Sequence, residues 1–295
     1  MKSRVEPYKI AWLAYVLVVP QLIVTLIFFL WPAVQTLWQS MLVQDPFGLS
    51  VDFVWFENFQ HLYNDPSYFE SVKKTIFFST MVTGLGIILA LFFAALTNHV
   101  TRGAKWYQNI FIWPYAIAPA IAAVLWGFLF SPSIGIITHF LAKIGIVWDH
   151  AINGDQAMTL VIVASIWKQI SYNFLFFLAA LKAIPKSLLE AAAIDGAGPI
   201  KRFFSIALPL ISPTTFFLVV INLIYAFFDT FAIIDATTEG GPSKATETLV
   251  YRVYQDGFKS LDLGGSATQS VILMALVIGL TIIQFRYIER KVNYV

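Results

Sequence analysis

The chain has 295 residues, of which 58% are hydrophobic, 16% are aromatic and only 12% are charged. Because the charged share is about half that of an ordinary soluble domain, the composition predicts a membrane protein. The net charge of +2 is too small to indicate nucleic-acid binding, and a sequence without cysteine has no disulfide, no thiolate nucleophile and no thiolate metal site.

Six apolar stretches follow one another along the chain, and each is long enough to cross a bilayer, which takes about 20 residues. We therefore expect an all-α membrane protein with six transmembrane helices. The first stretch follows basic residues, as a secretion signal does, but it is too long for one and lacks a small-residue cleavage site, so we expect a retained anchor. The stretches lie at 11–33, 75–97, 106–130, 158–181, 213–236 and 265–286.

The basic residues of the connecting segments predict the side of the membrane that each segment faces. Twelve of the 19 Lys and Arg residues lie in the N-terminus, the loops at 98–105 and 182–212, and the C-terminal tail, whereas six lie in the other connections. Both termini and these two loops are therefore predicted to face the cytoplasm. No repeat, low-complexity tract or linker divides the chain, which is expected to form a single transmembrane domain over 1–295.

Two segments on the other side, 34–71 and 237–264, contain Gly, Pro and aromatic residues and are expected to be partly ordered. The first holds five acidic residues and no Lys or Arg, which fits an external position. Since it is longer than a connection requires, it is expected to cap the helices or to meet an external partner.

The fourth predicted helix has a polar face. Ser165, Lys168, Gln169, Tyr172 and Asn173 recur along it at i, i+3, i+4, i+7 and i+8. A helix surrounded only by lipid does not carry such a stripe, so we expect this face to belong to a substrate pathway.

The predicted cytoplasmic loop at 183–212 interrupts the apolar pattern with two short helices. The first is expected to begin at Pro185 and to stop at Asp195-Gly196, because glycine tolerates the left-handed backbone that ends helices. The second is expected to begin at Pro199 and to be amphipathic, which suits either a surface helix anchored in the lipid interface or a docking site for another protein. Its apolar residues are Ile200, Phe203, Phe204 and Ala207, and its polar residues are Lys201, Arg202 and Ser205.

The fifth predicted helix carries Asn222, Tyr225 and Asp229 at i, i+3 and i+7, which extends the expected pathway. Counted from the cytoplasmic ends, Lys168 and Asp229 lie about 14 and 16 residues deep, hence roughly 21 and 24 Å into the membrane. A charge at that depth is costly unless it meets a partner or a wet cavity. Two interpretations stay open: a structural ion pair between the two helices, or a direct role with substrate.

No sequence motif indicates catalysis or metal binding. The chain has no GxxxxGK[ST] loop for ATP and no GxSxG nucleophile turn. His61, His99, His139 and His150 lack the HExxH spacing of a zinc site and are expected to be solvated or locally bonded. We therefore expect neither an enzymatic activity nor a cofactor in this chain.

The residue order in the 183–212 loop resembles the EAA loop of permease subunits from binding-protein-dependent ABC importers. Glu190-Ala191-Ala192 is followed by Gly196 and, after nine intervening residues, by Ile206-x-Leu208-Pro209. The resemblance implies a pair of coupling helices seated in a groove of a separate ATPase, with Gly196 setting the bend between them. The residues that it places at the ATPase contact are Glu190, Ala191, Ala192, Asp195, Gly196, Lys201, Arg202 and Phe203.

The likeness extends over nearly the whole chain, to the permeases of bacterial sn-glycerol-3-phosphate importers. It implies sn-glycerol-3-phosphate and glycerophosphodiesters as solutes, with a related carbohydrate importer as the alternative. One departure is Glu239, which stands where many relatives have a glycine or a small polar residue. The stretches that carry the likeness are WPYAIAPAIAAVLWGFLF (113–130), WKQISYNFLFFLAAL (167–181), YAFFDTFAIIDA (225–236), EGGP (239–242) and QFRYIE (284–289).

The resemblance also implies the rest of the assembly. It implies the type I, MetI-like importer fold, a second permease subunit, two copies of an ATPase that binds ATP and Mg, and a periplasmic binding protein. The complex would lie in the bacterial inner membrane, in contact with lipid and without a nucleic-acid partner. The competing hypothesis is a stand-alone secondary transporter in which Lys168 and Asp229 couple transport to an ion.

Overall fold

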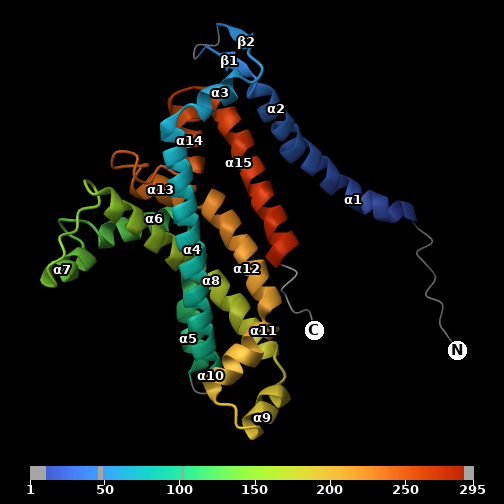
Figure 1. Cartoon of the computed structure of the whole chain (residues 1–295), viewed down its shortest axis with the longest axis vertical. Coiled ribbons are helices and arrows are strands. Elements are labelled where there is room, and N and C mark those ends of the chain that lie inside the picture. The colour runs from blue at the N-terminus through green and yellow to red at the C-terminus, as the bar shows by residue number, and fades with distance from the viewer. Residues whose placement is uncertain (1–10, 46–48, 101–102, 289–295) are drawn as a thin grey trace. The chain divides into compact units, whose positions relative to one another are not determined.

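The computed structural model describes residues 11–45, 49–100 and 103–288, which form two compact units. The first unit comprises the described residues up to Asn64 together with Val253–Ile272. The second comprises Asp65–Arg252 together with the described residues from Leu273 onward. Most of the described chain is helical, and Figure 1 labels the helices in chain order. The single domain expected over 1–295 stays a prediction, and the units are described in turn.

The first unit begins with a long apolar rod. Three helical segments follow one another without a gap, so the first predicted span, 11–33, continues to Gln39. None of the apolar window within Tyr15–Gln39 is buried in this chain, which leaves its side chains for lipid or for a partner. The segments are α1 (Ala11–Thr25), η1 (Leu26–Leu30) and α2 (Trp31–Gln39).

A small β-hairpin and a short helix follow the rod. The hairpin strands are antiparallel, with Val43 opposite Asp52, and they are the one departure from an all-α fold among the described residues. The Asn58 side chain ties the helix to the hairpin region because its amide donates to the carbonyls of Ser40 (3.0 Å) and Leu42 (2.9 Å). The elements are β1 (Leu42–Gln44), β2 (Val51–Phe53) and α3 (Glu57–Tyr63), and the unit also holds η5 (Gln255–Lys259).

The second unit holds most of the helices. A pair of long helices forms its centre, and shorter segments surround them (Figure 1). Its elements are α4 (Pro66–His99), α5 (Ala104–Ile112), η2 (Trp113–Ala116), α6 (Pro119–Leu129), α7 (Ile136–Lys143), α8 (Gly154–Ala183), α9 (Lys186–Ile194), α10 (Pro199–Arg202), η3 (Phe203–Ala207), α11 (Leu208–Leu210), α12 (Ser212–Ile224), η4 (Tyr225–Asp229), α13 (Phe231–Thr237) and η6 (Gln284–Ile288). Two further helices, α14 (Leu249–Tyr254) and α15 (Leu263–Ile283), begin in one unit and end in the other.

Small residues allow the two central helices, α4 and α8, to pack closely. The buried side of α4 carries Thr83, Gly86, Ala90, Ala94 and Thr97 at spacings of three and four residues. Such small-residue stripes let neighbouring helix backbones approach each other in membranes, where dispersion contacts drive association. On α8 a larger share is buried, including Phe174 and Phe177.

Within the described ranges, five helical stretches are long and apolar enough to cross a membrane, and the predicted third span is different. Residues 106–130 were expected to form one helix, and this is wrong: Lys105–Ala116 and Pro119–Leu129 meet at an angle of 106°. The cause lies in the sequence, because Pro119 has no N–H to continue the helix and disfavours a helical conformation at Ala118. Ala118 is accordingly extended, with φ −61° and ψ 142°. The remaining stretches are Tyr15–Gln39, Pro66–His99, Gly154–Ala183, Ser212–Asp229 and Leu263–Arg286.

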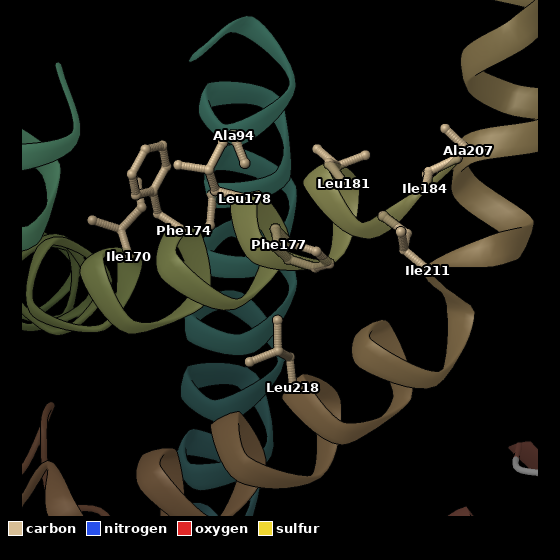
Figure 2. Close-up of a cluster of buried hydrophobic side chains, with 11 residues drawn as sticks. Ala94, Ile170, Phe174, Phe177, Leu178, Leu181, Ile184, Ala207, Ile211 and Leu218 are labelled. Carbon is tan, nitrogen blue, oxygen red and sulfur yellow. The ribbon is translucent and has the colours of Figure 1, made fainter. Parts of the chain in front are cut away.

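A cluster of buried side chains joins α4, α8 and α12 to the segment between α8 and α12 (Figure 2). Ring contacts continue it toward α5, since Phe111 lies 4.6 Å from Phe93 and 4.9 Å from Phe174 between ring centroids. We call this set the core cluster. Its members are Ala90, Ala94, Ile170, Phe174, Phe177, Leu178, Leu181, Ile184, Ala207, Ile211 and Leu218.

Candidate functional site

Residues 186–202 form a helical hairpin, the α9–α10 hairpin, whose boundaries agree with the predicted ones. α9 ends at Ile194 and α10 begins at Pro199. Between them Gly196 adopts a left-handed φ of +82°, which glycine reaches without a steric cost. The N–H of Ala197 donates to the carbonyl of Ala192 (2.9 Å) and closes the last turn of α9.

A side chain from the end of α10 holds the two arms of the hairpin together. The Arg202 guanidinium donates from Nη1 to the carbonyl of Leu189 on α9, at 3.2 Å. Arg202 is therefore half-buried, whereas its neighbour Lys201 is exposed. The sequence placed both on one polar side, and the structure separates them because Arg202 reaches back to α9.

The tip of the hairpin carries acidic and apolar side chains that nothing in the described chain covers. Glu190 and Asp195 are exposed, and so is Ala191, while Ala192 is half-buried. Ile194 is 88% exposed. The tip therefore presents charged and apolar side chains together on an exposed surface.

The base of the hairpin belongs to the core cluster. Ile184, two residues before the hairpin, and Ala207, at the end of η3 after it, are buried members of the cluster, and both are drawn in Figure 2. Leu189 and Phe203 pack against it from the two arms. A force applied at the exposed tip therefore reaches the packed helices through close contacts.

Two of the seven predicted pathway residues form a closed pair. Asn173 on α8 donates from Nδ2 to Oδ1 of Asn222 on α12 at 2.9 Å, and Asn222 returns a bond of 2.7 Å. Asn222 Nδ2 also donates to the carbonyl of Leu218 at 2.7 Å. Both residues are 0% exposed, so the pair lies inside the helix packing.

The other predicted pathway residues divide into buried and accessible ones. Gln169 and Tyr225 are buried, and the Tyr225 hydroxyl donates to the carbonyl of Ser165 at 3.3 Å. Tyr172 is half-buried, with its ring centroid 6.2 Å from that of Tyr115. Asp229 is exposed at the end of η4. The stripe on α8 thus combines a structural joint with a smaller accessible part.

The partners of Lys168 are backbone carbonyls, which the sequence did not predict. Among the described residues it forms no ion pair with Asp229. Its ammonium group donates instead to the carbonyls of Tyr115 (3.0 Å) and Pro114 (3.5 Å), at the bend between η2 and α6. It also lies 5.5 Å from the centroid of the Tyr115 ring, within range of a cation–π contact.

A charged network at the N-terminal end of α4 was missed from the sequence. Arg252 donates to Asp65 Oδ2 (2.5 Å) and to Ser67 Oγ (2.9 Å), and Ser71 Oγ donates to the buried Glu247 at 3.3 Å. Burial acts to raise the pKa of Asp65, but the bonds from Ser67 and Arg252 outweigh it and lower that pKa. The signal was Asp65-Pro66, an N-cap acid before proline, which marks the start of a helix.

Comparison with known proteins shows which family the chain belongs to. A family model described as "Binding-protein-dependent transport system inner membrane component" matches residues 82–294, which include the α9–α10 hairpin and the core cluster. The chain belongs to this family. Membership in a family of transport-system components leaves the hypothesis of a stand-alone secondary transporter without support.

Curated members of the family match along the full length of the chain. A Pectobacterium atrosepticum protein named sn-glycerol-3-phosphate transport system permease protein UgpA is 60% identical over 294 residues and all of both chains. Proteins of the same name from Yersinia pestis and Escherichia coli are 62% identical over 97% of both chains and 60% identical over all of both. Because these relatives are permease subunits, the family implies a transport subunit rather than an enzyme.

Solved structures share the fold. A chain of the bacterial alginate ABC transporter, in complex with an alginate pentasaccharide-bound periplasmic protein, matches with a TM-score of 0.81 and 23% identity over 92% of both chains. A chain of the MetNI methionine ABC transporter matches with a TM-score of 0.55 and 16% identity, over 76% of this chain and 95% of that one. At these identities the likeness establishes the ABC-importer permease fold alone.

Proposed function

We propose that the chain is a permease subunit of an ATP-driven importer and that the α9–α10 hairpin couples it to a separate ATPase. The observation that carries this proposal is the hairpin itself, whose tip is acidic, apolar and exposed while its base is part of the core cluster. A soluble partner that grips the tip moves α4, α8 and α12 together, because their buried contacts are close-packed.

The roles of the hairpin residues follow from their positions. Glu190, Asp195 and Lys201 present charges to the ATPase, and Ala191 and Ala192 let its backbone approach. Gly196 shapes the turn. Arg202 and Phe203 act from inside, by joining the two arms and by fixing α10 to the core cluster.

The remaining parts of the assembly follow from the family. The chain pairs with a second permease subunit, two copies of the ATPase bind ATP and Mg, and a periplasmic protein delivers the solute. Six spans, the third of them bent, cross the bacterial inner membrane. Both termini and the α9–α10 hairpin face the cytoplasm, which agrees with the distribution of basic residues.

The solute is sn-glycerol-3-phosphate, and glycerophosphodiesters are accepted as well. This assignment is supported by the names and the full-length similarity of the relatives and by Lys168, a cation in the middle of α8. A phosphate ester is negatively charged near neutral pH and favours such a cation. Lys168, Tyr172 and Asp229 form the accessible part of the pathway, and Gln169, Asn173, Asn222 and Tyr225 support it.

The test is the ATPase activity of the complex reconstituted in vesicles with its periplasmic binding protein. We expect glycerol 3-phosphate to stimulate ATP hydrolysis and to be taken up, whereas maltose has no effect. Glu190→Lys is expected to lower uptake at least tenfold and to weaken co-purification of the ATPase, because it reverses a charge at the contact.

The matched control is Asp155→Lys, which reverses an exposed charge in the first turn of α8, away from the hairpin. We expect it to retain uptake and co-purification. If Glu190→Lys behaved like this control, the coupling role of the hairpin would be refuted, and stimulation by maltose alone would refute the solute.

A further inference from the structure

The bend in the third span leaves a backbone carbonyl without its usual donor. In a continuous helix the carbonyl of Tyr115 would accept from the N–H of residue 119. Residue 119 is proline and has no N–H. The carbonyl of Pro114 accepts a hydrogen bond from the N–H of Ile117 at 3.2 Å, but this bond does not involve the carbonyl of Tyr115.

Lys168 supplies the missing donor from the neighbouring helix. Its Nζ lies 3.0 Å from the Tyr115 carbonyl and 3.5 Å from the Pro114 carbonyl, at the C-terminal end of η2, where the partial charge of the backbone is negative. Pro119 causes the 106° bend, and a side chain of α8 adds a cross-helix bond to it.

This bond is open to exchange. Lys168 is half-buried rather than enclosed, and no carboxylate among the described residues pairs with it. An ammonium group bonded to neutral amide carbonyls gains more from a charged oxygen, because two full charges of opposite sign attract each other more strongly than a charge and a carbonyl dipole do. The group lies over the Tyr115 ring, whose centroid is 6.2 Å from that of the half-buried Tyr172 ring.

We propose that Lys168 is an anion-operated latch on the third span. A phosphate ester that enters the pathway draws the ammonium group away from the carbonyls of Tyr115 and Pro114, so that the bend loses its cross-helix support and changes its angle. The same side chain thereby binds the substrate and, by doing so, releases the bent third span to move. This inference rests on the proposed function and adds a regulatory step to its pathway.

The latch is tested by measuring the bend in the reconstituted complex. Spin labels at Ile110 on α5 and Val124 on α6, both exposed positions, report the angle as a distance distribution. We expect a narrow distribution in the wild-type complex that shifts with glycerol 3-phosphate or inorganic phosphate and does not shift with glycerol. Lys168→Met should show the shifted distribution without any anion and no further response.

Two companion variants keep the test decisive. Lys168→Arg retains a cationic donor and is expected to keep the narrow distribution and the anion response. Lys143→Met removes a lysine that lies over the Phe140 ring, outside the bend, and should behave as wild type. A wild-type bend that ignores both anions, or a Lys168→Met variant with the wild-type distribution and response, would overturn the latch.

Uptake is measured on the same preparations so that the two proposals fail separately. A wild-type complex that takes up no glycerol 3-phosphate contradicts the proposed solute, whatever the bend does. A Lys168→Met complex that takes up glycerol 3-phosphate at the wild-type rate contradicts the latch and leaves the proposed solute unchanged.

Discussion

Asn173 and Asn222 show how a polar side chain can be placed correctly on a helix face and still have a different role. Helical spacing put both on inward faces of their helices, and both do face inward. Spacing along one helix says nothing about the partner across the interface. In the structure the two amides bond to each other, and both residues are fully buried, so the pair joins two helices.

We predict that Asn173→Leu and Asn222→Leu each destabilise the protein by about 1–2 kcal/mol, because each leaves one buried amide without its partner. The double variant should lose less than the sum of the two, since no unpaired amide remains. Denaturant titration of the purified protein in detergent measures this as a double-mutant cycle. Strict additivity would show that the pair contributes nothing beyond its separate parts.

The bonding partner of Lys168 could not be predicted from the sequence. The sequence indicated that a cation in the middle of a span needs a partner, and the structure supplies one. The two interpretations left open were an ion pair with Asp229 and a direct role with substrate. Backbone carbonyls were not considered, because they are free only where a helix breaks, and the break at Pro119 had been treated as part of a continuous span.

At the scale of elements, local signals with a steric cause were the reliable ones. Gly196 and Pro199 fixed the ends of α9 and α10 because a left-handed turn and an N-terminal proline are nearly obligatory there. The π-helical segments η3 and η4 have no comparable signal. π-helical turns are rare and occur mostly as single turns inside α-helices, so the local sequence gives little indication of where one forms.

The turn of the hairpin can be tested with two glycines that differ only in backbone conformation. Neither Gly196 nor Gly198 has another atom within 4 Å of an added methyl group, but only Gly196 has a positive φ. Gly196→Ala should therefore cost about 1 kcal/mol and distort the turn, whereas Gly198→Ala should not. ATPase stimulation in the complex is expected to fall several-fold for the first variant and to stay at wild type for the second. Equal stimulation would mean that the shape of the turn is irrelevant to coupling.

At the scale of the whole molecule, composition and length predicted a membrane-embedded helical protein, and the family and fold comparisons agree with it. Composition and length could not predict which side chains make up the core cluster. Apolar residues surround every span, and lipid-facing and buried ones look alike in sequence. Only the packing of α4, α8 and α12 distinguishes Phe174, which is fully buried, from its neighbour Leu175, which is exposed.

This pair of neighbours gives a prediction for coupling. Phe174→Ala removes the ring that links α8 to Phe111 and should destabilise the protein by roughly 3 kcal/mol. We also expect fewer molecules imported per ATP, because the core cluster no longer transmits motion from the hairpin efficiently. Leu175→Ala should change neither quantity appreciably. Vesicle uptake measured alongside ATP hydrolysis gives the ratio, and an unchanged ratio in Phe174→Ala would contradict a transmitting role.

The uninterrupted length of α4 has a mechanical consequence. Its 34 residues make a rod of about 51 Å, well beyond the bilayer's hydrocarbon thickness of about 30 Å. One end is clamped by Arg252 and Asp65, and the other lines a cavity with Pro199 and Arg202. A rod of that length swings its far end by roughly 0.9 Å for each degree of tilt. A rocking motion too slight to disturb the clamp thus becomes a displacement of several ångströms at the opposite membrane surface.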